Sequence, residues 1–383
     1  MSQAAFSFLT AGRIEFGRGV SEQAAGIALG FGTRVLVVRG RSVPWVNDLR
    51  GALRGLGANV QEVFSAGEPT LEALQTGLDV GRTLQADVIL AVGGGAVIDL
   101  GKAIAALLPG SGAVMDHLEG VGGAQPLTAA PLPMIAIPTT SGTGAEVTKN
   151  AVITVPDAGR KVSLRDPRMV PDVALIDPAL TDHTPRAQTL ASGLDALTQV
   201  IEPYVSHRAN PLTDALCSAA IPKGAQALAH LAEAECPQAR DDMAFVSLAG
   251  GLALTNAGLG AVHGLAGVLG GRLGAPHGLI CGRLLGPVMV ANASAIGAAG
   301  GVLDRFQEVA GWVGQGFDQD PNDIFERLPD LLDDWQVQRL SHWLTPETDL
   351  TQIADEAAGA SSMKANPCVL PASDLVGIMQ QAM

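Results

Sequence analysis

The chain has 383 residues, of which 47% are hydrophobic, 16% charged and only 4% aromatic, and its formal net charge is −14. A chain of this length and apolar content can bury a large aliphatic core, so the composition excludes an intrinsically disordered protein. The acidic balance argues against nucleic acid as a partner, because an acidic surface repels a phosphate backbone, although backbone N–H groups can still bind phosphate locally.

The first half of the chain alternates short β-branched runs with segments of helical length. The runs lie at 34–40, 87–95, 133–140 and 173–178, and helices are expected at 71–86 and 97–108. The runs are continuously apolar, which is typical of parallel strands covered on both faces. Together they predict β-α-β units and a doubly wound α/β sheet in a first domain, residues 1–182.

The second half, residues 183–383, is predicted to be all-helical. Ala-, Leu- and Gly-rich segments follow one another, and we expect breaks at the prolines 211, 222, 237, 276, 287, 321, 329 and 346. The run 248–271 reads as one buried helix, and the acidic stretch 313–338 as a solvent-facing helix or loop. The boundary between the halves falls near 178–190.

Cysteine usage and the N-terminus bear on the compartment. The four cysteines form no CxxC pair, and the first residues lack a basic segment followed by a long apolar one. We therefore expect reduced thiols and a cytoplasmic protein. No run reaches the ~18 uninterrupted apolar residues of a membrane span, so no membrane association is expected.

The first candidate site is AVGGGAVIDLGKAIA (91–105), where a strand runs into three glycines and then a helix. Glycine lets the backbone approach a phosphate closely, and a helix N-terminus offers free N–H groups and a positive dipole end. A pyrophosphate fits this arrangement. A tight strand-to-helix turn without a ligand fits it as well, and the run is not a GxGxxG fingerprint.

The second candidate is IPTTSGTGAEVTKNAVIT (137–154), a strand end followed by a cluster of hydroxyl-bearing residues and glycines. The hydroxyls of Thr139, Thr140, Ser141, Thr143 and Thr148 can bind a sugar, an amide or a phosphate. The alternative is a capping and turn segment with no ligand.

The third candidate combines one segment of the helical half with two histidines. Asp195 and Gln199 in ASGLDALTQVIEPYVS share a helix face, and Glu202 follows three residues later. His263 and His277 are 14 residues apart across a predicted break at Gly270–Gly271, one on a helix and one entering the next. One carboxylate and two imidazoles are a ligand set for Fe²⁺ or for catalytic Zn²⁺. The alternatives are a solvated polar face and satisfied core histidines.

The ordered motifs resemble one family over nearly the whole chain. GGGAVID, PTTSGTGAEVT, KVSLRDPRMVPDVALIDP, GLDALT, NPLTDAL, HG and PHG are similar to the iron-containing (group III) alcohol dehydrogenases. The resemblance implies a dinucleotide-binding domain at 1–182 and a helical metal and substrate domain at 183–383, with the active site in the cleft between them. It also implies NAD(P), a divalent metal (Fe²⁺, with Zn²⁺ the alternative) and a homodimer.

The resemblance assigns roles residue by residue. The implied metal ligands are Asp195, Gln199, His263 and His277, and the first, third and fourth are also the implied catalytic residues. The implied cofactor contacts are Gly40, Gly94, Gly95, Ala96, Asp99, Thr139, Thr140, Thr143, Thr148 and Lys161.

Three departures from the family pattern bear on the chemistry. The family usually has His where this chain has Gln199, and often a second His where this chain has Gly267. A Gln amide oxygen is a weaker ligand than imidazole for a late divalent metal, so we expect weakened metal binding. Cys281 is either a substitute soft ligand or a buried structural cysteine.

The third departure concerns the cofactor. The family often has an acid at the end of the first strand, where this chain has Gly40 between Arg39 and Arg41. An Arg accommodates the 2′-phosphate of NADP, so we expect NADPH tolerance or preference unless both are ordinary surface residues.

The sequence therefore predicts hydride transfer between an alcohol or aldehyde and NAD(P), with the metal as a Lewis acid. Gln199 leaves open a metal-independent reductase resembling maleylacetate reductase. A lyase resembling dehydroquinate synthase is a further alternative, against which the few basic residues of 240–282 count, as is a catalytically dead cofactor-binding protein.

Overall fold

The structure, a computed structural model, describes residues 5–41, 43–65 and 67–383. The chain divides into two compact units. The α/β unit comprises Leu9–Thr140 and Gly144–Thr181, and the helical unit comprises Asp182–Met383 with Ser141–Thr143 and residues 5–8.

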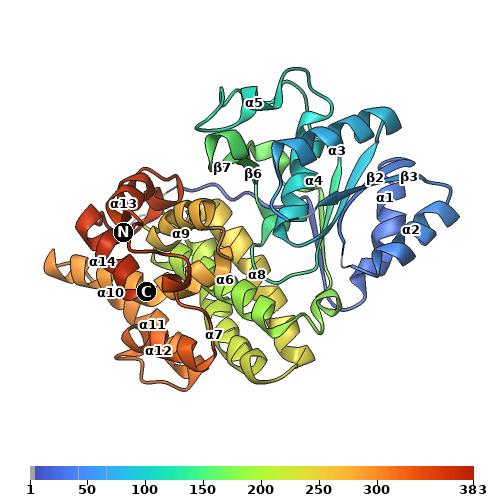
Figure 1. Ribbon diagram of the computed structural model, residues 1–383. Coiled ribbons are helices and arrows are strands. Elements are labelled where there is room, and N and C mark those ends of the chain that lie inside the picture. Colours follow the sequence, from blue (N-terminus) through green and yellow to red (C-terminus); the bar gives the residue numbers. More distant parts are fainter. Residues whose placement is uncertain (1–4, 42, 66) are drawn as a thin grey trace. The chain divides into compact units, whose positions relative to one another are not determined.

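The α/β unit is built on a parallel six-stranded sheet in the order β1-β8-β5-β4-β2-β3 (Figure 1). Its strands are β1 (Arg13–Phe16), β2 (Arg34–Gly40), β3 (Asn59–Ser65), β4 (Val88–Gly93), β5 (Met134–Pro138) and β8 (Val173–Ile176). Its helices are α1 (Ala24–Leu29), α2 (Val46–Gly55), α3 (Leu71–Leu84), α4 (Gly95–Leu107) and α5 (Val114–His117). Short 3₁₀ turns lie at Val20–Gln23, Ala145–Val147, Pro156–Ala158, Pro167–Met169 and Pro178–Thr181.

The sheet buries both of its faces, as the continuous apolar runs predict. Leu36 and Val38 of β2 pack with α3 and α4, whereas Val35 and Val37 of the same strand pack with α1 and α2. Figure 1 shows the two helix pairs on opposite faces of the sheet. The predicted runs coincide with β2, β4, β5 and β8, and the predicted α/β fold class is confirmed.

Four strands are absent from the sequence prediction. β1 and β3 lie at the two edges of the sheet, and β6 (Asn150–Val155) pairs antiparallel with β7 (Arg160–Arg165) in a separate ribbon. β3 intersperses buried residues with exposed ones, and β6 alternates buried with partly buried residues, so neither forms a continuous apolar run. β6 also converts the end of the predicted hydroxyl-rich loop into a strand.

The helical unit has no strand among its described residues, as predicted. Its long helices are α6 (Arg186–Val205), α7 (Pro211–Glu233), α8 (Pro237–Ala257), α9 (Ala261–Leu273) and α10 (His277–Ala298). Shorter ones are α11 (Asp304–Phe317), α12 (Ile324–Asp334), α13 (Leu350–Ala358) and α14 (Ala372–Gln381), with 3₁₀ turns at Leu340–His342 and Ser362–Ala365.

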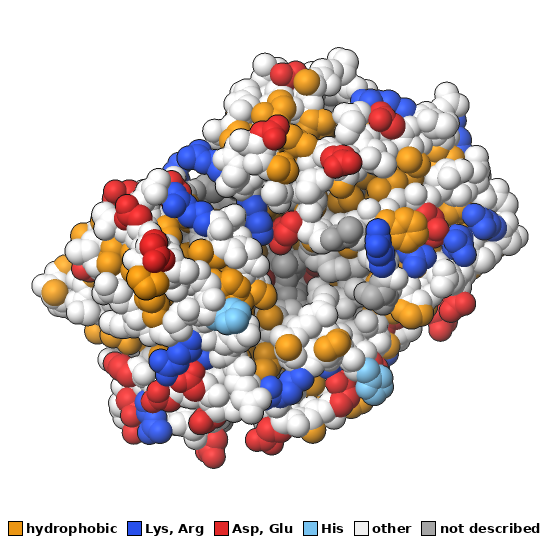
Figure 2. Space-filling model, in the orientation of Figure 1, with side chains coloured by type: hydrophobic (Ala, Val, Ile, Leu, Met, Phe, Trp, Pro, Cys, Tyr) orange, Lys and Arg blue, Asp and Glu red, His pale blue; other side chains and the backbone are white. Residues whose placement is uncertain are grey.

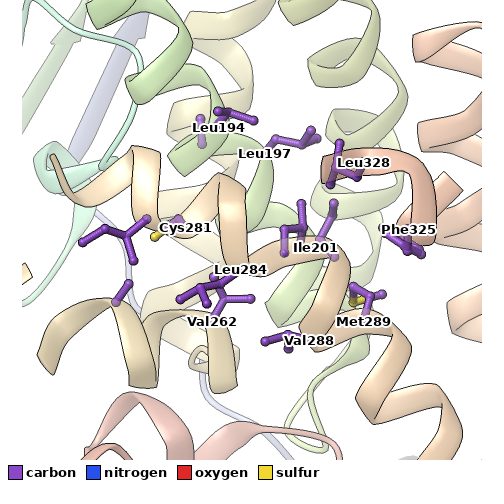
Figure 3. Close-up of a cluster of buried hydrophobic side chains, with 14 of the residues drawn as sticks. Leu194, Leu197, Ile201, Val262, Cys281, Leu284, Val288, Met289, Phe325 and Leu328 are labelled. Carbon is purple, nitrogen blue, oxygen red and sulfur yellow. The ribbon is translucent and has the colours of Figure 1, made fainter. Parts of the chain in front are cut away.

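Part of the core of the helical unit lies where α10 packs against α6 and α12. Figure 3 shows Leu194, Leu197 and Ile201 of α6 directed toward Leu284 of α10 and Leu328 of α12. All of these side chains are buried. The metal-ligand candidates of α6 and α10 therefore stand on helices that a continuous apolar core holds together.

One described helix, α10, is long and apolar enough to cross a membrane by length and composition alone, and α8 with α9 passes only as a pair bent by 103°. However, 67% of the α10 window is buried inside the protein. A core helix of a soluble protein passes the same test, and the packing in Figure 3 favours that interpretation for α10.

Several predicted helix limits are wrong. Pro222, Pro287 and Pro329 lie inside α7, α10 and α12, where packing on neighbouring helices compensates for the backbone hydrogen bond that each proline removes. The predicted single helix 248–271 turns sharply after α8, and the predicted break at Gly270–Gly271 lies inside α9.

The acidic stretch 313–338 is neither one helix nor one loop. It contains the end of α11, a connection and α12, which buries Ile324, Phe325, Leu328 and Leu332 on one face. Figure 2 shows Asp and Glu side chains together with Lys and Arg side chains over this region, at the lower left. Both charge signs are also interspersed among hydrophobic side chains over the rest of that view.

Candidate functional site

A buried polar stripe runs along α6. Asp195, Gln199 and Glu202 are spaced four and three residues apart, so their side chains emerge from one face of the helix. Each is only 3% exposed, although the surrounding residues of α6 are apolar. Buried polar groups need partners, and these three find theirs on α9 and α10 or on each other.

Glu202 attaches α9 to this stripe. Its carboxylate accepts the backbone N–H of Val262 at 2.7 Å and the Nδ1 proton of His263 at 2.6 Å. A Cβ at Gly260 would lie 2.9 Å from the Glu202 Oε1 atom, so only glycine allows this approach. Because Nδ1 is committed to Glu202, the Nε2 atom of His263 faces Asp195 Oδ1 at 3.3 Å.

His277, the first residue of α10, approaches α6 through the glycine that follows it. A Cβ at Gly278 would overlap the carbonyl oxygen of Ala191 and lie 2.9 Å from Asp195 Cβ. This close approach places His277 Nε2 3.9 Å from Asp195 Oδ1. One helical turn later, Cys281 Sγ lies 3.6 Å from His277 Nε2 and 3.8 Å from His263 Nε2.

The charges at this cluster favour a cation. Burial by itself raises the pKa of Asp195, but the hydrogen bond from His263 and the charges of both histidines hold that pKa below its usual value. Burial lowers the pKa of His277, yet its interactions with Cys281 and then with Asp195 outweigh burial and raise that pKa to about 9. The pKa of His263 is also well above its usual value, because Cys281 and Glu202 outweigh its burial.

The residues present fit a metal ion. One ligand atom from each of Asp195, His263, His277 and Cys281 lies within 4.8 Å of the others, which is the one such group among the described residues. The Oε1 atom of Gln199 is buried beside them and has no hydrogen-bond partner. A carboxylate, two imidazoles and a thiol that converge in this way are ligand types of a late divalent cation, whose binding displaces their protons.

Most of the predicted cofactor contacts lie at the end of the α/β sheet where the carboxyl ends of its strands meet. The chain runs from β2 outward to β3 and then returns to β4 on the other side of β2. The order of the strands therefore reverses between β2 and β4, and ligands of open α/β sheets bind beyond the carboxyl ends of the strands at such a point. Gly40 ends β2 there, and Gly93 ends β4.

The N-terminus of α4 opens at the same edge. Its first turn begins at Gly94 without a side-chain cap, and Gly95 and Ala96 follow as its first residues. Thr140 lies against it, because a Cβ at Gly94 would be 3.3 Å from the Thr140 hydroxyl. An uncapped N-terminus with free N–H groups can hold a phosphate. Phosphate binding by these residues therefore stays a prediction that the geometry permits.

Asp99 and Thr148 belong to a buried cluster around Lys102. The Lys102 ammonium donates to the Thr148 hydroxyl at 2.7 Å, to Asp99 Oδ1 at 2.9 Å and to the carbonyl oxygen of Asn150. The second Asp99 oxygen accepts the N–H of Val152 at 2.9 Å. Contact of Asp99 and Thr148 with a cofactor stays a prediction, and their described partners lie inside the protein.

The remaining predicted residues lie on other elements. Thr139 follows β5 and donates its N–H to Gly93, Lys161 lies on β7 with Glu68 at 3.3 Å, and Thr143 is counted with the helical unit. Sequence reasoning assigned no role to Glu202 and left Cys281 open. The four-and-three spacing from Asp195 through Gln199 was a usable signal for Glu202; for Cys281, only the approach of α10 to α6 shows where its thiol lies.

Both halves of the chain match known families. Residues 11–178 match a family described as iron-containing alcohol dehydrogenase. Residues 189–383 match the C-terminal part of the Fe-containing alcohol dehydrogenase family.

Individual relatives agree with these matches. A stretch of 212 residues is 42% identical to long-chain-alcohol dehydrogenase 1 of Geobacillus thermodenitrificans, covering 55% of this chain and about half (53%) of that relative. Alcohol dehydrogenase 4 of Saccharomyces cerevisiae is 33% identical over 82% of this chain and 80% of its own length. A solved structure described as 1,3-propanediol oxidoreductase has a TM-score of 0.89 at 30% identity, covering 99% of this chain and 100% of that one.

Proposed function

Because the chain belongs to the iron-containing alcohol dehydrogenase family, we propose that it transfers a hydride between NAD(P) and a primary alcohol or aldehyde. Membership confirms the family and the oxidoreductase class predicted from the sequence. The observation that carries the proposal is the convergence of Asp195, His263, His277 and Cys281 within 4.8 Å. A buried donor set of this kind is where a substrate oxygen would be polarised.

Some side chains of the helical unit would bind the divalent metal directly, and others would orient these ligands. Asp195, His263 and His277 supply ligand atoms, and the bound metal supplies a Lewis acid for the substrate oxygen. Glu202 fixes the tautomer of His263 by accepting its Nδ1 proton, which leaves Nε2 for the site. Gln199 contacts Asp195 by a side-chain hydrogen bond and so orients the carboxylate.

The α/β unit is proposed to hold the nicotinamide cofactor, which supplies the hydride chemistry. The uncapped start of α4 would receive the pyrophosphate, and the end of β2 would face the adenosine ribose. Arg39 contacts the Gly40 carbonyl oxygen at 3.2 Å and Glu62 at 3.4 Å, whereas Arg41 is exposed. Arg41 is thus the better candidate for a 2′-phosphate, and KM values for NADPH and NADH test this; a strong NADH preference would contradict it.

The substrate is proposed to be a primary alcohol or its aldehyde. The relatives named above act, by their names, on a long-chain alcohol and on a three-carbon diol, so chain length stays open. Gly267 leaves no imidazole at that position of α9, so the proton exchanged with the substrate would pass through water or the cofactor ribose.

The experiment is an aldehyde screen with NADH and NADPH, carried out on the purified protein before and after chelation. We expect oxidation of the reduced cofactor by at least one aldehyde, loss of that activity on chelation, and recovery with a divalent metal. Cofactor binding with no turnover of any aldehyde would contradict the dehydrogenase.

Gln199 favours one second candidate, a metal-independent reductase similar to maleylacetate reductase. In that case the chelated protein would keep its full activity. Net oxidation of NAD(P)H by an aldehyde would also exclude the lyase alternative, because such an enzyme returns its cofactor unchanged.

The protein is further proposed to be a homodimer and to reside in the cytoplasm. The family resemblance supports the dimer, and the four free cysteines are compatible with a reducing compartment. The mass in solution by light scattering and the localisation of a tagged chain test these two points separately.

A further inference from the structure

We propose that the thiolate of Cys281 is the fourth ligand of the metal centre, and that this Asp-His-His-Cys set makes the site prefer zinc to iron. This inference rests on the proposed function only in taking the Asp195 cluster as the metal centre. It differs from the sequence expectation, in which Gln199 takes the fourth position.

Three of the four distances between ligand atoms are close to those of a tetrahedral zinc site, and the fourth is longer. With the usual zinc bond lengths, a tetrahedron puts nitrogen and sulfur ligands about 3.5 Å apart and nitrogen and oxygen ligands about 3.3 Å apart. Cys281 Sγ lies 3.6 Å from His277 Nε2 and 3.8 Å from His263 Nε2. Asp195 Oδ1 lies 3.3 Å and 3.9 Å from the Nε2 atoms of His263 and His277.

The backbone explains why this cysteine reaches the site. Cys281 is four residues after His277 on α10, so both side chains lie on the same face of one helix. Gly278 and Gly282 have no Cβ, and a Cβ at Gly282 would lie 3.0 Å from Leu194 Cβ on α6. The α10 helix therefore lies close enough to α6 for the buried thiol to face Asp195.

Gln199 is better placed to orient a ligand than to be one. Its side chain is hydrogen-bonded to Asp195, which accepts, so the amide nitrogen faces the carboxylate. Its Oε1 atom is buried without a hydrogen-bond partner. This unpartnered oxygen can accept a hydrogen bond from a hydroxyl or a water that enters the site, a role distinct from metal ligation.

The ligand chemistry sets the metal preference. Thiolate is a soft ligand that favours zinc, and it is a poor match for the oxygen- and nitrogen-rich sites of Fe²⁺. Replacing an imidazole by an amide on α6 and adding a thiolate on α10 therefore moves the site from an iron set to a zinc set. His263, His277 and Asp195 serve either metal, so Cys281 decides the preference.

The first test is spectroscopic and needs no substrate. Metal-free protein is loaded with Co²⁺, and the wild type is expected to show near-ultraviolet sulfur-to-cobalt charge-transfer absorption that Cys281→Ser lacks. X-ray absorption of the zinc form should show one sulfur scatterer at about 2.3 Å. A cobalt spectrum without a thiolate band would overturn the proposal, whatever the activity.

The second test is metal affinity, measured by competition with a chelator dye. Cys281→Ala should weaken zinc binding by more than about a hundredfold, because loss of a mere hydrogen-bond partner of a ligand costs about 10–100-fold. Cys281→Ser should lower the ratio of zinc to iron affinity by about tenfold or more, as an oxygen donor replaces the soft sulfur. Gln199→Ala, which removes only a hydrogen-bond partner of Asp195, should weaken zinc affinity by about 10–100-fold and so by less than Cys281→Ala.

Cys217→Ala is the matched control, because Cys217 is an equally buried thiol of the same unit, on α7 and away from the cluster. Thermal unfolding of the metal-free variants verifies that each has folded. Weak zinc binding in Gln199→Ala with unchanged binding in Cys281→Ala would assign the ligand to Gln199. A thiolate band in a protein that reduces no aldehyde would leave this proposal standing and remove the proposed function instead.

Discussion

Each unit of the chain buries a cluster of charged side chains, and the two clusters differ in their balance of hydrogen-bond donors and acceptors. In the α/β unit, the three protons of Lys102 meet three oxygens, and the remaining oxygen of Asp99 has its own N–H donor. In the helical unit, acceptor atoms of Asp195, His263, His277 and Cys281 converge, and a buried oxygen of Gln199 has no partner.

The difference separates a structural cluster from a binding site. A buried network whose donors and acceptors are matched stabilises the fold and has nothing left to offer a ligand. A network in which acceptor atoms outnumber donors favours a bound positive charge, which a metal ion supplies. Substitutions in the first cluster should therefore change stability, and substitutions in the second should change metal content and activity.

The largest effect is expected for His263→Ala. Removing this imidazole takes away a ligand and the partner of Glu202, so metal content should fall to near zero. Loss of Lewis-acid stabilisation of several kcal/mol corresponds to about a 10³-fold lower kcat/KM. Metal analysis and steady-state kinetics measure both, with His230→Ala, an exposed histidine of α7, as the control. Retained activity without metal would move the chain to the metal-independent reductase.

The converse substitution is Lys102→Met in the closed cluster. It leaves Asp99 buried without its counter-charge, and breaking a buried pair on one side costs about 3–5 kcal/mol. Denaturant unfolding should show this loss, while zinc affinity stays unchanged. Adding Asp99→Asn should restore part of the stability. A loss below about 1 kcal/mol would mean that Lys102 is not held by the contacts described.

A pH-dependent effect is expected from Glu146, which lies next to the Lys102 cluster and is 2% exposed. Burial raises the pKa of Glu146 to about 7, and its own backbone hydrogen bond and the Lys102 charge only partly oppose this. The unfolded chain releases the proton near pH 4.5, so the carboxyl destabilises the fold increasingly from about pH 4.5 to pH 7.

Glu146→Gln should remove this cost. Relative to the wild type, the variant should gain up to about 3 kcal/mol of unfolding free energy between pH 4.5 and pH 8, and little below pH 4.5. Parallel denaturant titrations at several pH values measure the difference, in which the other titrating groups cancel. A difference that does not vary with pH would show that Glu146 titrates normally.

The contrast between the clusters also shows what the sequence reveals. Runs such as 34–40 predict central strands because both faces are buried, whereas edge strands like β3 keep one exposed row and look like loops. The prolines misled the helix limits, because tertiary packing in α7, α10 and α12 tolerates what a peptide helix does not.

At the site, residue type and spacing make Asp195, His263 and His277 candidates, and the structure brings them together, while their role as metal ligands stays a prediction. Residue type and spacing do not suffice for Cys281 or Lys102. A cysteine in an apolar helix usually packs as a small hydrophobe, and a lysine usually reaches solvent. Only the packing of α10 near α6 shows that Cys281 faces imidazoles. Likewise, only the packing of α4 near β6 shows that Lys102 is enclosed by oxygens.

The smallest of these effects, and the finest test of the contrast, is expected for Glu202→Gln. Glu202 touches no ligand atom of the site; it accepts the Nδ1 proton of His263 and the N–H of Val262. If it serves the metal through His263, zinc affinity should fall by about 10–100-fold, and activity should return at saturating zinc. If it only caps α9, stability alone should change. Glu308→Gln, which weakens a partly buried hydrogen bond from Tyr204 in the same unit, sets the scale of a purely structural loss. If the zinc affinity of Glu202→Gln falls no further than that of the control, Glu202 has a structural role only, like Lys102, whose hydrogen-bond partners all lie within the protein.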